Sequence, residues 1–108
     1  MSSLDRLVHE PARLAILTAL SACRTADFLF LQSLTGLTKG NLSNHLSKLE
    51  DAGLVTIEKR FKGKLPQTII GLSARGRETI KRHWKHLQQL RRAADDWMAS
   101  VQAKPSEG

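Results

Sequence analysis

Residues 37–55 read LTKGNLSNHLSKLEDAGLV, and this stretch decides the fold. Its leucines recur at helical spacing and predict a helix over 39–52 with one buried face. Thr38 is a suitable N-cap for that helix, and Gly53 can end it because glycine tolerates the left-handed conformation of a helix end. Leu54 is then expected to pack back on the helix. The buried stripe consists of Leu42, Leu46 and Leu49.

Two further helices are predicted upstream, after a short leading helix over 4–8. Pro11 suits the first turn of the earlier one, because the N–H that proline lacks has no partner there. Its apolar stripe, which leaves Arg13 outside, consists of Ile16, Leu17, Ala19 and Leu20. Asp27 can cap the later helix and Gly36 can end it. The inner face of the later helix is expected to consist of Phe28, Leu31 and Leu34.

The segment between these two helices, residues 21–26, predicts a polar connection. Cys23 follows an apolar run and is interpreted as a small core residue rather than a reactive thiol, because no cationic cluster or second cysteine lies near it in the sequence. A single cysteine cannot form an intrachain disulfide, and this favours a reducing cytoplasm as the setting.

The periodicity changes from helical to alternating after the decisive stretch. Residues 55–61 alternate between two faces and predict a strand, and 67–72 predict a second strand. A flexible basic turn over 62–64 joins the two into a β-hairpin, with Pro66 at its exit. Ser73 can then cap a long final helix.

Length and charge limit the class of protein. With 108 residues, 41% of them hydrophobic, the chain has room for one domain and one modest core. Lys and Arg total 17 against 10 Asp and Glu, so the formal net charge is +7, which favours a polyanionic partner.

The sequence predicts a mainly α fold with a β-hairpin wing. It comprises one domain over 1–102, with a winged helix-turn-helix core over 11–73 and a C-terminal helix over 74–102, and a disordered tail over 103–108.

The helix over 39–52 carries a small, polar face opposite its leucine stripe. In a helix-turn-helix the second helix enters the major groove of DNA, so amides and hydroxyls on this face can meet base edges and lysines can meet phosphates. An ordinary solvated helix face is the alternative interpretation. The face consists of Gly40, Ser43, Asn44 and Ser47, with Lys39 and Lys48 beside it, Asn41 and His45 at its margins and Thr38 at its start.

The hairpin tip is strongly basic and is interpreted as a wing over 59–66. Such a tip can straddle the phosphate backbone or enter the minor groove beside the recognition helix. The alternative is an edge strand protected by lysines against aggregation. The cations of the tip are Lys59, Arg60, Lys62 and Lys64.

Several motifs resemble the small winged-helix regulators of the MarR-like and ArsR-like kind. They are LTKGNLS at 37–43, HL at 45–46, LE at 49–50, GLV at 53–55, LSARGR at 72–77, and HEPAR at 9–13 followed by Leu14 and Ile16. The resemblance spans about residues 4–84 and is specific for fold and DNA binding. It implies that recognition-helix residues Lys39, Asn41, Ser43, Asn44 and Lys48, and wing residues Arg60 and Lys62, contact DNA. The thiolate pair that the best-known ArsR-like metal sensors carry in their recognition region is not present in this sequence.

The final helix is too long for the core of so small a domain. Its apolar residues follow alternating spacings of four and three, a heptad seam that only Arg91 interrupts. We interpret the seam as a homodimer interface, which the leading helix over 4–8 can assist. A helix lying on its own domain is the alternative, but it would leave two exposed tryptophans. The expected interface consists of Ile80, Trp84, Leu87, Leu90, Ala94, Trp97, Met98 and Val101.

Other classes of function find little support. No apolar run approaches the roughly 18 residues of a membrane helix, the N-terminus lacks a secretory pattern, and no catalytic grouping stands out. His83 and His86 have a spacing that could share a metal, but Arg82 and Lys85 oppose a bound cation. We therefore expect no enzyme activity, no metal and no cofactor.

The sequence as a whole predicts a cytoplasmic, homodimeric transcriptional regulator that binds specific double-stranded DNA. Two alternatives stay open: an architectural DNA-binding protein with little sequence preference, and a winged-helix adaptor that binds proteins. The basic wing tip argues against the adaptor, which has no need of it. No small-molecule effector is assigned.

Overall fold

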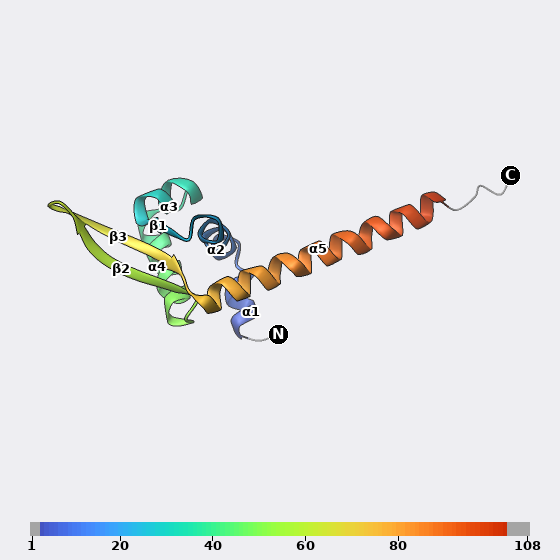
Figure 1. Cartoon of the computed structure of the whole chain (residues 1–108), viewed down its shortest axis with the longest axis horizontal. Helices are drawn as coiled ribbons and strands as arrows, with labels where there is room; N and C mark the ends of the chain where they lie inside the picture. The colour runs from blue at the N-terminus through green and yellow to red at the C-terminus, as the bar shows by residue number, and fades with distance from the viewer. Residues whose placement is uncertain (1–2, 104–108) are drawn as a thin grey trace.

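The computed structural model describes residues 3–103, which form five helices and three strands (Figure 1). The predicted class, mainly helical with a β-hairpin wing and a long C-terminal helix, is confirmed. The helices are α1 (Ser3–Val8), α2 (Pro11–Cys23), α3 (Phe28–Thr35), α4 (Lys39–Asp51) and α5 (Ala74–Ala103). The strands are β1 (Thr25–Asp27), β2 (Val55–Lys62) and β3 (Leu65–Leu72).

The core lies where α2, α3 and α4 meet the inner part of the sheet and the first turns of α5. The predicted stripe of α4 is buried, as are Ile16, Leu17 and Leu20 of α2. Leu54 is fully buried behind α4, and its backbone N–H donates to the carbonyl of Leu49 over 2.9 Å. The core is thus built mainly from aliphatic side chains, which hold α4 by one face and leave its other face free.

Short polar residues begin the helices of the helix-turn-helix. The side chain of Asp27 accepts a hydrogen bond from the backbone N–H of Phe30, and that of Thr38 accepts one from the N–H of Asn41. Gly36 ends α3 in the left-handed conformation, with φ of 72°. All three of these predicted helix ends are confirmed. Glu10 caps α2, a role the sequence did not predict.

The connection predicted over 21–26 is wrong, because α2 continues to Cys23 and residues 25–27 form a strand. Strand β1 pairs antiparallel with β3 and places Ala26 opposite Ile70. Ala26 is buried by that pairing, whereas Cys23 is exposed on the last turn of α2. The core position predicted for Cys23 is therefore also wrong, because the helix carries that side chain past the end of the apolar stripe.

The inner face predicted for α3 is only partly right. Leu31 is fully buried and Phe28 packs against the core, but Leu34 is 56% exposed. The helix is only eight residues long, and a single buried leucine is enough to hold it. The turn toward Gly36 then carries Leu34 away from the core.

The sheet has the strand order β1-β3-β2, with both pairs antiparallel. Its long hairpin joins β2 to β3 through a turn at residues 63–64, where Gly63 has a φ of 66°. The predicted hairpin is confirmed, although β3 begins at Leu65 and so includes Pro66. Val55 pairs with Leu72 beside the core, and Phe61 pairs with Pro66 near the tip. The outer half of the hairpin projects from the body of the molecule (Figure 1).

A single residue, Ser73, joins the wing to α5. Its backbone N–H donates to the carbonyl of Leu54 and its hydroxyl donates to the carbonyl of Gly53, over 3.0 and 2.6 Å. The hydroxyl also accepts from the N–H of Gly76, which confirms the predicted cap. Gly76 lies so close to Leu54 that a Cβ on it would overlap the Leu54 carbonyl oxygen. The joint is thus packed backbone against backbone.

Helix α5 packs on the body only through its first turns and then extends away from it (Figure 1). It gives the molecule extents of 76 × 27 × 22 Å. Of the predicted tail over 103–108, only Ala103 is described, as the last residue of α5, and the other residues lie outside the described part of the chain. Within residues 3–103, no helix combines the length and the apolar character that crossing a membrane requires.

Candidate nucleic-acid interface

The predicted recognition face of α4 is exposed along its whole length. The three buried leucines hold the opposite face of the helix against the core, so the polar residues turn outward. Thr38 is exposed although its hydroxyl caps the helix. Glycine at position 40 leaves open space at the start of the helix. The exposed predicted DNA-contact residues of this helix and its cap are Thr38, Lys39, Asn41, Ser43, Asn44, Ser47 and Lys48.

A polar cluster on α2 holds α4 from behind. The Nε–H of Arg13 donates to Nδ1 of His45 over 3.2 Å, and one of its terminal nitrogens donates to the carbonyl of Leu7. The carboxylate of Glu10 lies 3.6 Å from the same His45 nitrogen. The Arg13 side chain is only 12% exposed, so the prediction that it lies outside the packed stripe is wrong. His45 lies at the margin of the helix face, where the sequence placed it.

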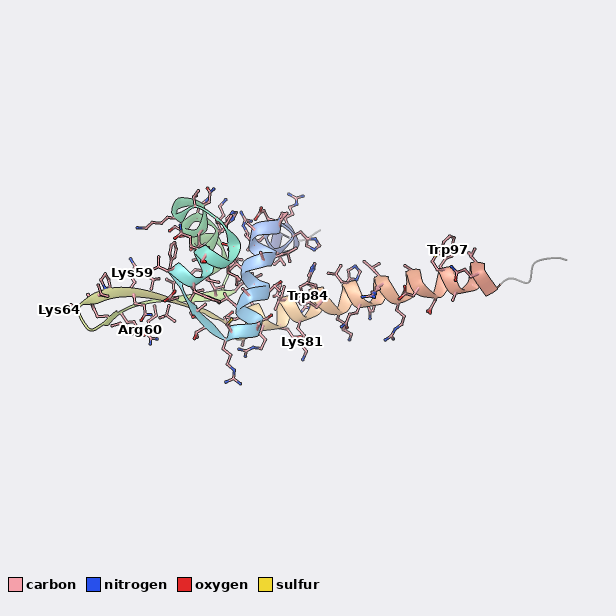
Figure 2. The ribbon with its side chains drawn as sticks, turned by 90° about the horizontal axis from the view of Figure 1, so that it is seen from above. Lys59, Arg60, Lys64, Lys81, Trp84 and Trp97 are labelled. Atoms are coloured by element: carbon pink, nitrogen blue, oxygen red, sulfur yellow. The ribbon has the colours of Figure 1, made fainter. Side chains whose placement is uncertain are left out.

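The four predicted wing cations are exposed, and they lie on two different faces of the hairpin. Lys59 belongs to the face that continues from the pair of partly buried Ile57 and buried Ile70, whereas Arg60 and Lys62 belong to the other face. Lys64 lies in the turn. Arg60 forms an ion pair with Glu58 over 3.0 Å, so part of its charge is already compensated. Figure 2 shows Lys59, Arg60 and Lys64 at the end of the molecule opposite Trp97.

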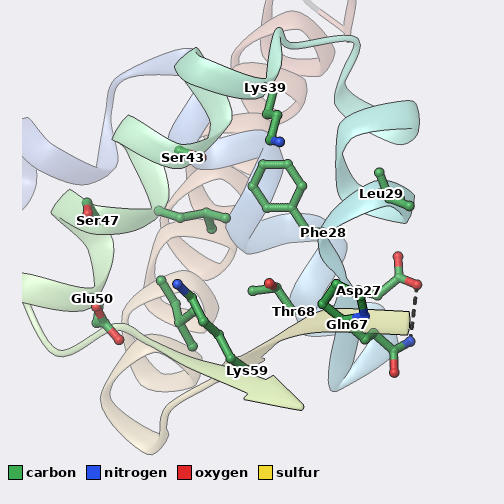
Figure 3. Close-up of a pocket in the computed structure, with 13 residues that line it drawn as sticks. Asp27, Phe28, Leu29, Lys39, Ser43, Ser47, Glu50, Lys59, Gln67 and Thr68 are labelled. Atoms are coloured by element: carbon green, nitrogen blue, oxygen red, sulfur yellow. Dashed lines mark hydrogen bonds between the residues drawn. The ribbon is translucent and has the colours of Figure 1, made fainter. Parts of the chain in front are cut away.

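A groove of about 610 Å³ separates α4 from the wing (Figure 3). Lys39, Ser43 and Ser47 line it from α4, and Lys59 points into it from β2. Its apolar lining residues include Phe28, Leu46, Ile57 and Pro66, and its acidic ones are Asp27 and Glu50. The structure therefore brings part of the predicted helix face and one predicted wing cation to a common surface.

Four polar residues that line this groove were not predicted as site residues from the sequence: Asp27, Glu50 of α4, and Gln67 and Thr68 of β3. Thr68 pairs with Lys59 across the hairpin and shares its face. The side-chain amide of Gln67 donates to the carboxylate of Asp27 over 3.4 Å, and that carboxylate also caps α3 (Figure 3). Thr68 could have been predicted if the pairing register of the two strands were known, but the sequence does not determine that register.

The predicted dimer residues of α5 fall into two groups. Ile80 is 1% exposed and belongs to the core of its own chain, so its assignment to the interface is wrong. The helix packs on α2 at that level, and Ile80 fills the contact. The other predicted residues are exposed: Trp84, Leu87, Leu90, Ala94, Trp97, Met98 and Val101. Arg91, which interrupts the seam, lies 3.9 Å from Asp95 in an exposed pair.

His83 of α5 contacts His9, which lies between α1 and α2. The rings of His83 and His9 meet edge to face, with centroids 5.5 Å apart. Burial, together with the neighbouring His9 and His86, lowers the pKa of His83 below its ordinary value of 6.5. Within the described residues, no group of three or more His, Cys, Asp or Glu side chains could hold a metal ion.

Comparison with known proteins agrees with this geometry. Residues 12–91 match the family model described as the winged helix DNA-binding domain. An uncharacterized protein of Methanocaldococcus jannaschii, MJ0432, is 34% identical over 86 residues, which cover 79% of this chain and 92% of that protein.

Solved structures show the same arrangement. A transcriptional regulator homologue from Pyrococcus horikoshii is 32% identical and has a TM-score of 0.77, over 83% of this chain and 89% of that one. A MarR family transcriptional regulator from Silicibacter pomeroyi shares the fold at 17% identity, with a TM-score of 0.56 over 96% of this chain and 63% of that one.

Proposed function

Because the chain belongs to the winged helix DNA-binding domain family, we propose that it is a homodimeric transcriptional regulator that recognises a specific sequence of double-stranded DNA. The resemblance to MarR-like winged-helix regulators is confirmed. The family and its structural neighbours support a DNA-binding regulator. The proposals of sequence preference and of a homodimer go beyond that family assignment. They rest on the exposed face of α4 and on the exposed apolar stripe of α5.

The observation that carries the DNA assignment is the groove shared by α4 and the wing. Lys39 and Lys59 line it from opposite sides, and Ser43 and Ser47 lie between them on the helix. A duplex that receives α4 in its major groove turns one phosphate backbone toward the neighbouring wing. The two lysines are then placed to neutralise phosphates of that backbone.

The proposed sequence preference rests on the outer face of α4. Asn44 offers both a donor and an acceptor, and asparagine can form a bidentate pair with the edge of adenine. Ser43 and Gly40 beside it are small and exposed, so the helix can approach the floor of the groove closely. A protein that reads only the backbone has no use for this combination of an amide and small neighbours.

The proposed homodimer rests on the exposed apolar stripe of α5. Trp97 is 64% exposed and lies far from the body of its own chain (Figure 2). Leu90, Met98 and Val101 are also exposed on this projecting part of the helix. A second α5 packed along the stripe would cover these side chains, and hydrophobic burial favours that pairing. Two-fold symmetry would then present two recognition helices to half-sites about 34 Å apart.

Light scattering tests the dimer directly. The full chain should show about twice its mass of 12.0 kDa at micromolar concentration. Replacing Trp97 and Met98 together by glutamate should give a monomer with the same circular dichroism spectrum, since both side chains are exposed. Ala99→Glu is the matched control, because exposed position 99 lies about 200° around the helix from Trp97 and about 100° from Met98, on the side away from the stripe. A wild-type chain that has the monomer mass contradicts the dimer.

Selection from fragmented genomic DNA tests the sequence preference. Fragments retained by the full-length protein should share a site bound at least ~1,000-fold more tightly than random duplex at the same salt concentration. Equal affinity for retained and random DNA would instead identify an architectural protein. Failure to bind either DNA, with the fold intact, would favour the adaptor.

A further inference from the structure

Phe61 is a large aromatic side chain that stands exposed on the wing. It is 74% exposed and lies two residues before the turn that begins at Gly63. A ring exposed to this degree keeps most of its apolar surface in water, and contact with a partner that removes this surface from water is favourable. The DNA contacts assigned above, which are cations and polar groups, make no use of it.

The register of the hairpin fixes the face on which Phe61 lies. It pairs with Pro66 across the strands, and the next pair inward on the same face is Lys59 with Thr68. Pro66, Lys59 and Thr68 all line the groove between the wing and α4. Phe61 therefore lies on the face of the hairpin that lines this groove, one residue pair closer to the wing tip than Lys59 and Thr68.

The charges around Phe61 identify the kind of partner. The ionisable side chains of residues 59–66 are all basic, and the acidic residue that precedes them in the sequence, Glu58, is paired with Arg60 on the other face of the hairpin. The acidic residues that line the groove, Asp27 and Glu50, come from outside the hairpin. An apolar contact framed by cations fits a polyanion that also has apolar surface. The DNA backbone has both, because its phosphates alternate with deoxyribose rings whose C–H groups form the walls of the minor groove.

We infer that Phe61 and Pro66 pack against deoxyribose rings of the backbone strand that runs between α4 and the wing. The inference rests on the proposed function and adds an apolar, sequence-independent contact to it. Lys59 on the same face and Lys64 in the turn hold the adjoining phosphates, and the ring fills the space between them. The contact fixes how deeply the wing sits in the minor groove.

Substitution of Phe61 tests this contact, with affinity measured on a random-sequence duplex of about three helical turns at several salt concentrations. Phe61→Ala should weaken binding about tenfold, equivalent to ~1.4 kcal/mol. The slope of log affinity against log salt should not change, because no cation is lost. Phe61→Leu should recover most of the affinity. Light scattering should give Phe61→Ala the mass of the wild type.

Leu65→Ala is the matched control. Leu65 is 71% exposed near the same tip, but it pairs with Lys62 on the opposite face of the hairpin. Its substitution should leave affinity unchanged. Wild-type affinity in Phe61→Ala, or an equal loss in Leu65→Ala, would overturn the inference while leaving DNA binding itself intact. Absence of DNA binding by the wild type would instead refute the proposed function.

Discussion

The Nε–H of Arg13 donates to Nδ1 of His45 over 3.2 Å and so joins α2 to α4, the proposed recognition helix. The nearby carboxylate of Glu10 balances the guanidinium charge. The cluster ties α2 to α4 at the margin of the exposed face of α4.

Removing the donor from this cluster should destabilise the fold. Arg13→Met keeps most of the aliphatic chain but removes the hydrogen bonds to His45 and Leu7, so the free energy of unfolding should fall by ~1–3 kcal/mol. Urea unfolding followed by circular dichroism measures the change. Arg6→Met, at an exposed arginine of α1, is the control and should stay within ~0.5 kcal/mol of the wild type.

The wing cations should contribute unequally to DNA binding. Lys62→Gln combined with Lys64→Gln should weaken binding to every sequence and flatten the salt dependence by about two charges per subunit. Arg60→Gln should have a smaller effect, because Glu58 already pairs with Arg60. Fluorescence anisotropy across a salt series measures both quantities. If the slope of log affinity against log salt were equal for the double variant and the wild type, Lys62 and Lys64 of the wing would not contact DNA phosphates.

The exposed face of α4 should set sequence preference. Asn44→Ala and Ser43→Ala should each lower affinity for the selected site by ~1–3 kcal/mol and have little effect on random duplex. Lys48→Gln, on the same helix, should instead lower both affinities together, as expected of a phosphate contact. Parallel losses on both DNAs in the Asn44 and Ser43 variants would mean that α4 reads only the backbone.

Gly76 should tolerate no side chain. Alanine there would overlap the Leu54 carbonyl oxygen, and we expect Gly76→Ala to lower the free energy of unfolding by at least ~2 kcal/mol. Gly40→Ala is the control: it is also helical but has open space, so alanine should leave stability unchanged or raise it by up to ~1 kcal/mol. Chemical unfolding compares the two. Similar stability of both variants would show that the joint can open.

Stability should fall as the solution is acidified, partly through His83. Its pKa is lowered in the folded chain, so the unfolded chain binds the proton more tightly. The contribution is therefore fully present above the ordinary pKa of 6.5 and is lost as pH falls below it. His83→Gln should show a shallower loss of thermal stability from about pH 7.5 to about pH 5.5. Lys81→Gln, on the same helix, leaves His83 in place and should follow the wild type.

Strong periodic signals made part of this fold predictable. Helix α4 combines a cap at Thr38, a leucine stripe and a terminating glycine, and the wing alternates over enough residues to define a hairpin. Strand β1 has only three residues, too few to show alternation, and it exists because β3 offers it an edge. Cys23 was misplaced for the same reason, since the boundary between α2 and β1 depends on that pairing.

The composition of the site was harder to predict than its position. A stripe on a helix defines its outer face, so the candidate residues of α4 could be named from spacing alone. Which hairpin residues share a face with that helix depends on the register, and Thr68 was missed for this reason. The burial of Arg13 and of Ile80 could not be predicted without knowing which elements pack beside them. Residues that depend on a partner distant in sequence carry no local signal.

The joint at Ser73 has a mechanical consequence. With one residue between β3 and α5, and that residue bonded to the carbonyls of Gly53 and Leu54, no loop is available to absorb a rotation of the helix. The wing, about 25 Å long, and α5, about 45 Å long, are therefore rigidly connected and should rotate as one body. In any pair of chains held through α5, the angle between the two helices determines the separation of the wing tips. A change of a few degrees in the angle between the two α5 helices would move the wing tips by ångströms.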